Sequence, residues 1–204
     1  METKEARRET MKKWLVGILA IICASMPLSV APAEALPQEN FDSMLPVMDS
    51  ILRCCVENDM TYDAGNPEFF WSVLYYYCAN WAKDDPECEI VDGELRVPAE
   101  RMKAYAKALF DGVESFPAPP ADCVIRYDAD WQSYFMPASD ASENAIVVRS
   151  TYDQPNGSIS VEAELIQPDG TPIAALHAFL VPDANAQESD EFPYSVSEAL
   201  IEYE

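Results

Sequence analysis

Residues 69–81 of this chain read Phe-Phe-Trp-Ser-Val-Leu-Tyr-Tyr-Tyr-Cys-Ala-Asn-Trp, which is apolar or aromatic at nearly every position. Asn66, Pro67 and Glu68 precede the run, and this order is typical of a helix that begins with an asparagine N-cap and a proline in its first turn. A helix that is apolar nearly all round cannot lie on a surface with one side in water. We therefore expect the rest of the chain to cover this helix from more than one side.

Two further helices are predicted, one before and one after this stretch. Residues 41–57 place a set of apolar side chains on one helical face, namely Met44, Leu45, Met48, Ile51, Leu52 and Cys55. The other helix is expected to begin at Pro98 and to end at Gly112. Between the second and third helices, Asp92-Gly93 suits the type I′ turn of a small hairpin over residues 90–97.

The period of the hydrophobic pattern changes to two after the stiff connector 116–120. Strands are expected over residues 124–127, 131–135, 145–152, 158–167, 171–181 and 194–203. Helices followed by antiparallel strands predict an α+β fold, in which three helices pack on a C-terminal antiparallel sheet. We expect one domain over residues 36–204, mainly helical over 36–115 and an antiparallel sheet over 121–204. This layout resembles, by analogy of fold alone, the cone-like cystatin and NTF2-type folds.

The N-terminal 35 residues have the order of a secretory signal peptide. Lys12 and Lys13 precede a short apolar run, and Ala33-Glu-Ala35 forms an Ala-x-Ala cleavage site. Translation from Met11 would give a leader of ordinary length. We therefore expect an exported chain, periplasmic or secreted, that is cleaved after Ala35. The alternative is an uncleaved N-terminal segment that anchors the chain in a membrane.

The charge of the chain excludes two classes of partner. Its 204 residues contain 13 basic and 36 acidic side chains, a formal net charge of −23. Cleavage after Ala35 removes five basic and four acidic residues, which leaves 8 and 32, or −24, over 169 residues. Nucleic acids and anionic membrane surfaces both need a basic footprint, so neither is expected as a partner.

The single histidine, His177, lies in the middle of the expected strand 171–181. It could act as a general base or a metal ligand, but no Gly-x-Ser-x-Gly, His-Glu-x-x-His or Walker-type motif accompanies it. Asp128 and Asp130 form an Asp-x-Asp turn and are the other candidates for acid–base chemistry. We expect His177 to be a structural residue, and a hydrolase or isomerase that uses His177 or this carboxylate pair is the alternative.

Five cysteines remain after cleavage, and an oxidising compartment permits two disulfides among them. Spacing argues against Cys55 with Cys78, because in an antiparallel helical hairpin Cys78 would lie roughly 16 Å from the connecting loop. We expect a Cys78–Cys88 disulfide, and Cys123 paired with either Cys54 or Cys55 as a second one. Reactive thiolates are disfavoured in so acidic a chain.

Two surface features are candidate binding sites. The first is the acidic loop, whose members are Asp84, Asp85, Glu87 and Glu89. Its oxygen ligands suit calcium, but it lacks the spacing of a complete calcium-binding loop. We therefore expect a run of solvated charges. Trp131 and Tyr134 flank the turn at 128–130 and are the predicted aromatic binding residues. Arg101, Lys103 and Lys107 gather on one side of the third helix, where pairing with nearby carboxylates is expected.

These observations favour a non-enzymatic domain that binds a protein or an envelope component in a groove between helix and sheet. No cofactor is predicted. The competing hypothesis is a small hydrolase or isomerase with its site in the mouth of a cone-shaped sheet.

Overall fold

The aromatic stretch forms helix α3 (Pro67–Asn80) in the computed structural model, which describes residues 42–139, 143–183 and 191–203. The side chain of Asn66 accepts a hydrogen bond from the backbone N–H of Glu68 at 2.9 Å, so the predicted N-cap is confirmed. Helix α2 (Leu45–Asn58) follows a short 3-10 turn and packs against α3. Helix α4 (Ala99–Leu109) contacts both of these helices.

The strands form two separate antiparallel sheets of four strands each. Sheet A has the order β1-β2-β4-β3, and sheet B has the order β5-β6-β7-β8. Sheet A consists of β1 (Glu89–Val91), β2 (Glu94–Pro98), β3 (Arg126–Asp128) and β4 (Ser133–Pro137). Sheet B consists of β5 (Ala145–Asp153), β6 (Ile159–Ile166), β7 (Pro172–Pro182) and β8 (Tyr194–Tyr203).

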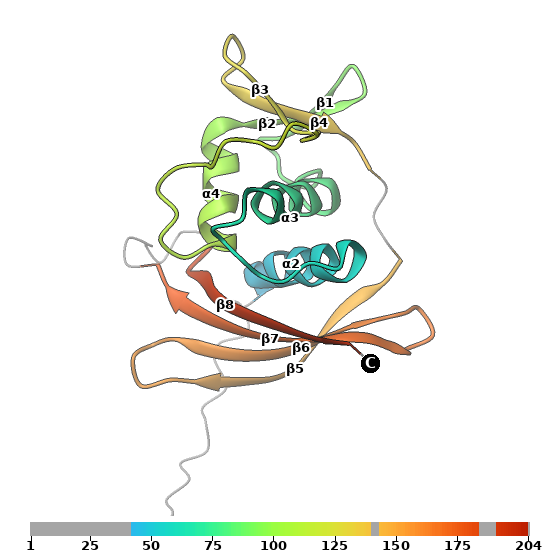
Figure 1. Cartoon of the computed structure of the whole chain (residues 1–204), viewed down its shortest axis with the longest axis vertical. Helices are drawn as coiled ribbons and strands as arrows, with labels where there is room; N and C mark the ends of the chain where they lie inside the picture. The colour runs from blue at the N-terminus through green and yellow to red at the C-terminus, as the bar shows by residue number, and fades with distance from the viewer. Residues whose placement is uncertain (1–41, 140–142, 184–190, 204) are drawn as a thin grey trace, which may run out of the picture. The chain divides into compact units, whose positions relative to one another are not determined.

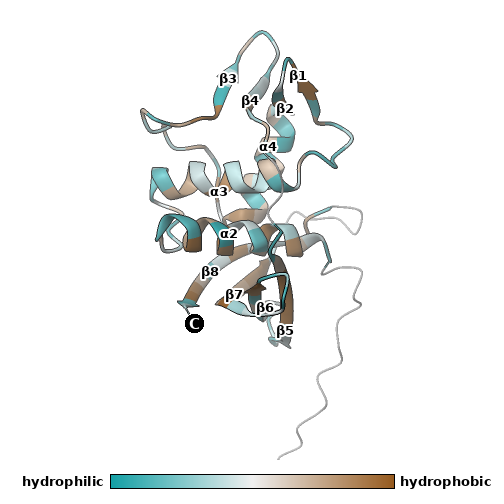
Figure 2. Cartoon of the chain, turned by 90° about the vertical axis from the view of Figure 1, so that its right-hand side faces the viewer, coloured by the Kyte–Doolittle hydropathy of each residue, from teal (hydrophilic) through white to brown (hydrophobic). Residues whose placement is uncertain are grey.

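The two sheets lie on opposite sides of the helices, as Figures 1 and 2 show from two directions. Helix α3 contacts β2 of sheet A, whereas α2 contacts β5, β6 and β7 of sheet B. Helix α4 runs across the helical layer and contacts strands of both sheets. Each sheet therefore covers a different part of the apolar helical layer, and the helices meet in the middle.

The expectation of one C-terminal sheet over residues 121–204 is wrong. The hairpin β3–β4 pairs with the early hairpin β1–β2, through the register Leu95 with Met136 and Val97 with Tyr134. Only residues 145–203 contribute strands to sheet B. A single sheet has one inner face and covers one side of a helical layer, whereas α3 needs cover on several sides. The cone-like analogy to cystatin and NTF2-type folds is therefore not confirmed, whereas the α+β class with three helices is.

The predicted signal peptide, residues 1–35, and its cleavage site lie outside the described residues. No helix of the described chain is long and apolar enough to cross a membrane.

A buried ion pair joins the helical layer to sheet B. Asp49 and Arg53 of α2 are 1% and 4% exposed, and Arg53 Nε donates to both carboxylate oxygens of Asp49 at 2.8 Å. Trp81 Nε1, just beyond α3, donates to Asp49 Oδ2 at 3.0 Å. The Arg53 guanidinium also donates to the backbone carbonyl of Asn144, beside the start of β5. One charged pair thus connects α2, the end of α3 and the first strand of sheet B.

Replacing Asp49 by Asn should destabilise the fold strongly, because Arg53 would remain buried without a counter-charge. We expect a loss of about 3–5 kcal/mol in the free energy of unfolding, measured by urea denaturation. The matched control is Glu94→Gln, which breaks the 2.6 Å pair with Arg126 on the surface of sheet A. We expect that change to lower the free energy of unfolding by less than about 1 kcal/mol. Equal losses for the two variants would contradict the importance of the buried pair.

Candidate functional site

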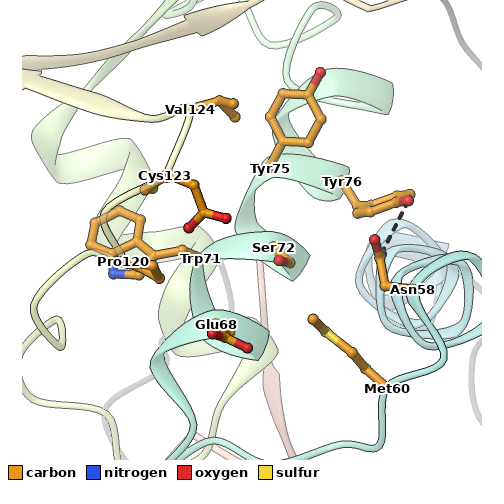
Figure 3. Close-up of a pocket in the computed structure, with 11 residues that line it drawn as sticks. Asn58, Met60, Glu68, Trp71, Ser72, Tyr75, Tyr76, Pro120, Cys123 and Val124 are labelled. Carbon is orange, nitrogen blue, oxygen red and sulfur yellow. Dashed lines mark hydrogen bonds between the residues drawn. The ribbon is translucent and has the colours of Figure 1, made fainter.

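A groove of about 410 Å³ runs along the part of α3 that neither sheet covers. Its floor is a helical stripe of Glu68, Ser72 and Tyr75, which are spaced so that they share one side of the helix. Figure 3 shows Asn58 and Met60 at one edge, where α2 ends. The connector that leads into β3 forms the other edge with Pro120, Cys123 and Val124. This volume falls within the range of small-ligand sites.

Two of the aromatic rings in the groove are held by hydrogen bonds. The Tyr76 hydroxyl donates to Glu57 Oε2 at 2.7 Å and accepts from Asn58 Nδ2 at 3.2 Å. Trp71 Nε1 donates to the backbone carbonyl of Pro117 at 3.1 Å, which fixes the connector against α3. The Tyr75 hydroxyl, in contrast, has no hydrogen-bond partner among the described residues. The groove therefore presents a rigid aromatic wall with one free phenol.

The charge in the groove has one sign. Glu68 and Asp122 line it, and none of the described residues that line it is basic. The Cys123 thiol donates to the carbonyl of Ile125, and burial raises the pKa of this thiol. Burial and the hydrogen bond to Glu57 also raise the pKa of Tyr76. Both shifts favour the protonated thiol and phenol at neutral pH, so the charge of the groove comes from its two carboxylates.

His177 lies on the face of sheet B that points away from the helices. Its imidazole is 44% exposed, with Nδ1 3.8 Å from Glu162 Oε1 and Nε2 3.9 Å from Glu202 Oε2. Both distances are longer than a hydrogen bond between a nitrogen and an oxygen atom. The histidine thus lies between two carboxylates on an open sheet surface, and no described residue forms a hydrogen bond to its imidazole.

The turn carboxylates lie far from this histidine in the fold, because they belong to sheet A and the helices separate the two sheets (Figure 1). Asp128 Oδ1 accepts from the backbone N–H groups of Asp130 and Trp131 at 3.0 and 3.2 Å. This carboxylate therefore caps its own turn. The structure does not bring His177, Asp128 and Asp130 into one site.

The two predicted aromatic binding residues, Trp131 and Tyr134, lie on opposite faces of sheet A. Trp131 is 52% exposed on the outer face, under the Arg96 guanidinium at 5.3 Å and beside Phe135. Tyr134 turns toward the helices and packs against Trp71 and Phe116 with ring centroids 6.1 and 5.8 Å apart. They do not form a joint surface, because Trp131 lies in the turn before β4 and packs beside Phe135, whereas Tyr134 is the adjacent residue of β4 and points to the other face.

Two carboxylates of the acidic loop are engaged by different protein partners. Arg101 and the Tyr105 hydroxyl both donate to Asp85. Partial burial alone would raise the pKa of Asp85, but these hydrogen bonds and one from the backbone of Glu87 lower it below its usual value. Glu89 pairs with Arg96 at 2.9 Å, away from the other members of the loop. Among the described residues, no group of three or more His, Cys, Asp or Glu side chains is placed to hold a metal ion.

The basic residues of α4 have different surroundings. Arg101 is paired with Asp85 and also with Glu191, at 2.6 Å, as local pairing predicts. Neither Lys103 nor Lys107 lies within 4.0 Å of a carboxylate in the described part of the chain.

All five described cysteines are free thiols, so neither expected pairing is present. The Cys88 sulfur lies 3.6 Å from the Tyr105 hydroxyl instead of bonding to Cys78. Cys123 lies in the connector with its thiol directed at the Ile125 carbonyl, whereas Cys54 and Cys55 are buried in α2. The sulfurs of Cys88 and Cys123 thus make hydrogen-bond contacts in place of the expected disulfides.

A comparison of the chain with protein-family models, curated proteins and solved structures finds no match.

The sequence predicts a groove between helix and sheet, whereas this groove lies between α3, the end of α2 and the connector at residues 120–124. One signal for this position is present in the sequence. Glu68 and Ser72 interrupt an otherwise apolar helix at a spacing of four, and Tyr75 continues the same stripe. Such a stripe marks the side of a helix that stays uncovered. The opposite wall, residues 120–124, comes from a connector whose path depends on contacts far along the chain.

The thiols should differ greatly in reactivity in the native protein. Burial raises the pKa of Cys54 and Cys55 to about 12, and it raises the pKa of Cys78 well above its usual range. These three thiols should therefore be protected from iodoacetamide. A pKa of about 12 instead of 9.0 lowers the thiolate fraction about a thousandfold near neutral pH. We expect Cys88 and Cys123 to be modified first and the other three only after unfolding, as measured by mass spectrometry of the labelled peptides. A Cys78–Cys88 crosslink in a non-reducing peptide map would contradict the structure.

Proposed function

We propose that this chain is an exported, non-enzymatic binding domain whose α3 groove takes a cationic segment of a partner protein or envelope component. The observation that supports this proposal is the lining of the groove, which combines the rings of Trp71, Tyr75 and Tyr76 with the carboxylates of Glu68 and Asp122. An ammonium or guanidinium group is stabilised both by the face of an aromatic ring and by a carboxylate. Each cation–π contact contributes about 0.5–2 kcal/mol, and a charge-assisted hydrogen bond to a carboxylate adds to it.

The charge of the whole domain supports the same class of partner. A formal charge of −24 after leader cleavage attracts cations and accelerates their encounter with the groove. Because exposed charges are screened by salt, such a partner should associate faster at low ionic strength. The alternative hydrolase or isomerase gains no support from the open surroundings of His177.

Selection of random linear peptides on the mature domain, residues 36–204, tests the groove. We expect enrichment of lysine or arginine next to an aromatic residue, and Tyr75→Ala should weaken the selected peptides about tenfold in isothermal titration calorimetry. Glu68→Gln and Asp122→Asn should each weaken binding and reduce its salt dependence.

Two variants serve as controls for this experiment. Ile90→Ala removes an apolar side chain that is 55% exposed on sheet A, and Glu114→Gln removes an exposed carboxylate outside the groove. Neither should change the affinity. Selected peptides without a basic residue, or binding that survives all three groove substitutions, would refute the proposed function.

Export predicts that the mature chain begins at Leu36 when the full chain is expressed with its leader in a bacterial host. The N-terminus is read by Edman sequencing or mass spectrometry of the exported fraction. Ala35→Arg should block cleavage, because the cleavage site requires a small residue, whereas Ala35→Gly should be processed normally. An intact leader on the wild-type chain in the membrane fraction would support the anchored alternative instead.

A further inference from the structure

The outer face of sheet B is the surface formed by the side chains of β5–β8 that point away from α2. Along β6 and β7 buried and accessible residues alternate, and the buried set faces the helices. The strand registers place accessible residues in two adjacent rows that cross all four strands. The first row is Tyr152, Ser160, Phe179 and Glu198, and the second is Ser150, Glu162, His177 and Leu200.

This outer face carries three large apolar or aromatic side chains among its polar residues. Leu200 is 60% exposed and Tyr152 is 53% exposed. Phe179 is half-buried, in the same row as Tyr152 and on the strand next to that of Leu200. The open face of an antiparallel sheet is ordinarily polar. These side chains border a depression of about 400 Å³ that crosses β5, β6, β7 and β8. Exposed apolar side chains gathered in one depression mark an interaction surface more often than isolated ones do.

Carboxylates surround the apolar side chains. Glu164 is neutralised by Arg149 at 2.6 Å. Glu198 has no lysine or arginine partner within the described ranges, and neither do Glu162 and Glu202, which flank His177. Glu162 accepts a hydrogen bond from Ser150 Oγ at 2.5 Å, which fixes its position in the second row. The face therefore offers an apolar centre with at least three carboxylates that an incoming cation can pair with.

We propose that the outer face of sheet B docks an amphipathic helix that carries lysine or arginine beside its apolar stripe. A helix about 10–12 Å wide matches the width of the two adjacent rows and can lie across the four strands. Its apolar residues would contact Leu200, Phe179 and Tyr152, and its basic residues would pair with the glutamates. Charge disfavours a second copy of this chain as the occupant, because the same carboxylates would then face one another. This surface is independent of the α3 groove, so the domain would bridge two partners.

The test uses a soluble helical peptide built from Leu-Lys-Lys-Leu-Leu-Lys-Leu repeats, titrated into the mature domain and followed calorimetrically and by amide NMR. We expect amide shifts to cluster at Glu162, Phe179 and Leu200. Leu200→Glu should weaken binding about tenfold although it adds negative charge, because it removes the apolar anchor. Replacing both Glu198 and Glu202 by Gln should weaken binding several-fold and reduce its dependence on salt.

The controls separate this surface from other exposed side chains and from folding defects. Ile90→Ser, at an equally exposed apolar residue on sheet A, and Glu114→Gln, at an exposed carboxylate outside both proposed surfaces, should leave the affinity unchanged. Thermal unfolding of each variant checks that the fold is retained. Equal or tighter binding by Leu200→Glu would show that charge alone attracts the peptide and would overturn the proposal. A dimer in sedimentation analysis that Leu200→Glu dissociates would also overturn it, in favour of a second copy as the occupant.

Discussion

Helix α3 carries apolar side chains on nearly every side, and burying them requires neighbours in several directions at once. Helix α2 covers one side, α4 crosses another, and sheet A covers a third. Aromatic contacts fill the space between them, with Phe70 stacked on Phe110 at 4.8 Å and Tyr77 against Tyr105 at 4.5 Å. Sheet B then covers the remaining apolar side of α2. The order of layers follows from this single requirement, since each added element brings an apolar face that needs cover in turn.

The same requirement accounts for the location of the groove. The neighbouring elements leave α3 uncovered along the stripe of Glu68, Ser72 and Tyr75. The polar groups of these side chains can be hydrated there. The aromatic residues beside that stripe remain at the edge of the core, and the connector at residues 116–124 is held against them by Trp71. The groove thus lies at the edge of the hydrophobic core, and the packed core side chains hold its aromatic wall in place.

Charge has two different roles in this domain. The buried pair of Asp49 and Arg53 also makes hydrogen bonds to the end of α3 and to the start of β5, and so orients the layers relative to one another. The Asp85, Arg101 and Tyr105 cluster similarly holds the acidic loop against α4. The remaining acidic residues lie largely on the surface, where they give each exposed apolar patch a negative surround. The proposed partners of the groove and of the outer face of sheet B are cationic for this common reason.

The sequence by itself determined the local structure. The N-cap of α3, the Asp92-Gly93 turn and the alternation in β6 and β7 all depend on residues a few positions apart, and all are present in the structure. It also showed that α3 had to be covered on several sides. The tertiary structure decided that β2 pairs with β4, which divides the strands into two sheets. It also placed Cys88 beside Tyr105 and brought residues 120–124 next to α3. These contacts join residues distant along the chain, and their energies depend on how all the layers pack together. Hydrophobic periodicity specifies which face of an element is buried, but it does not specify which other element buries it.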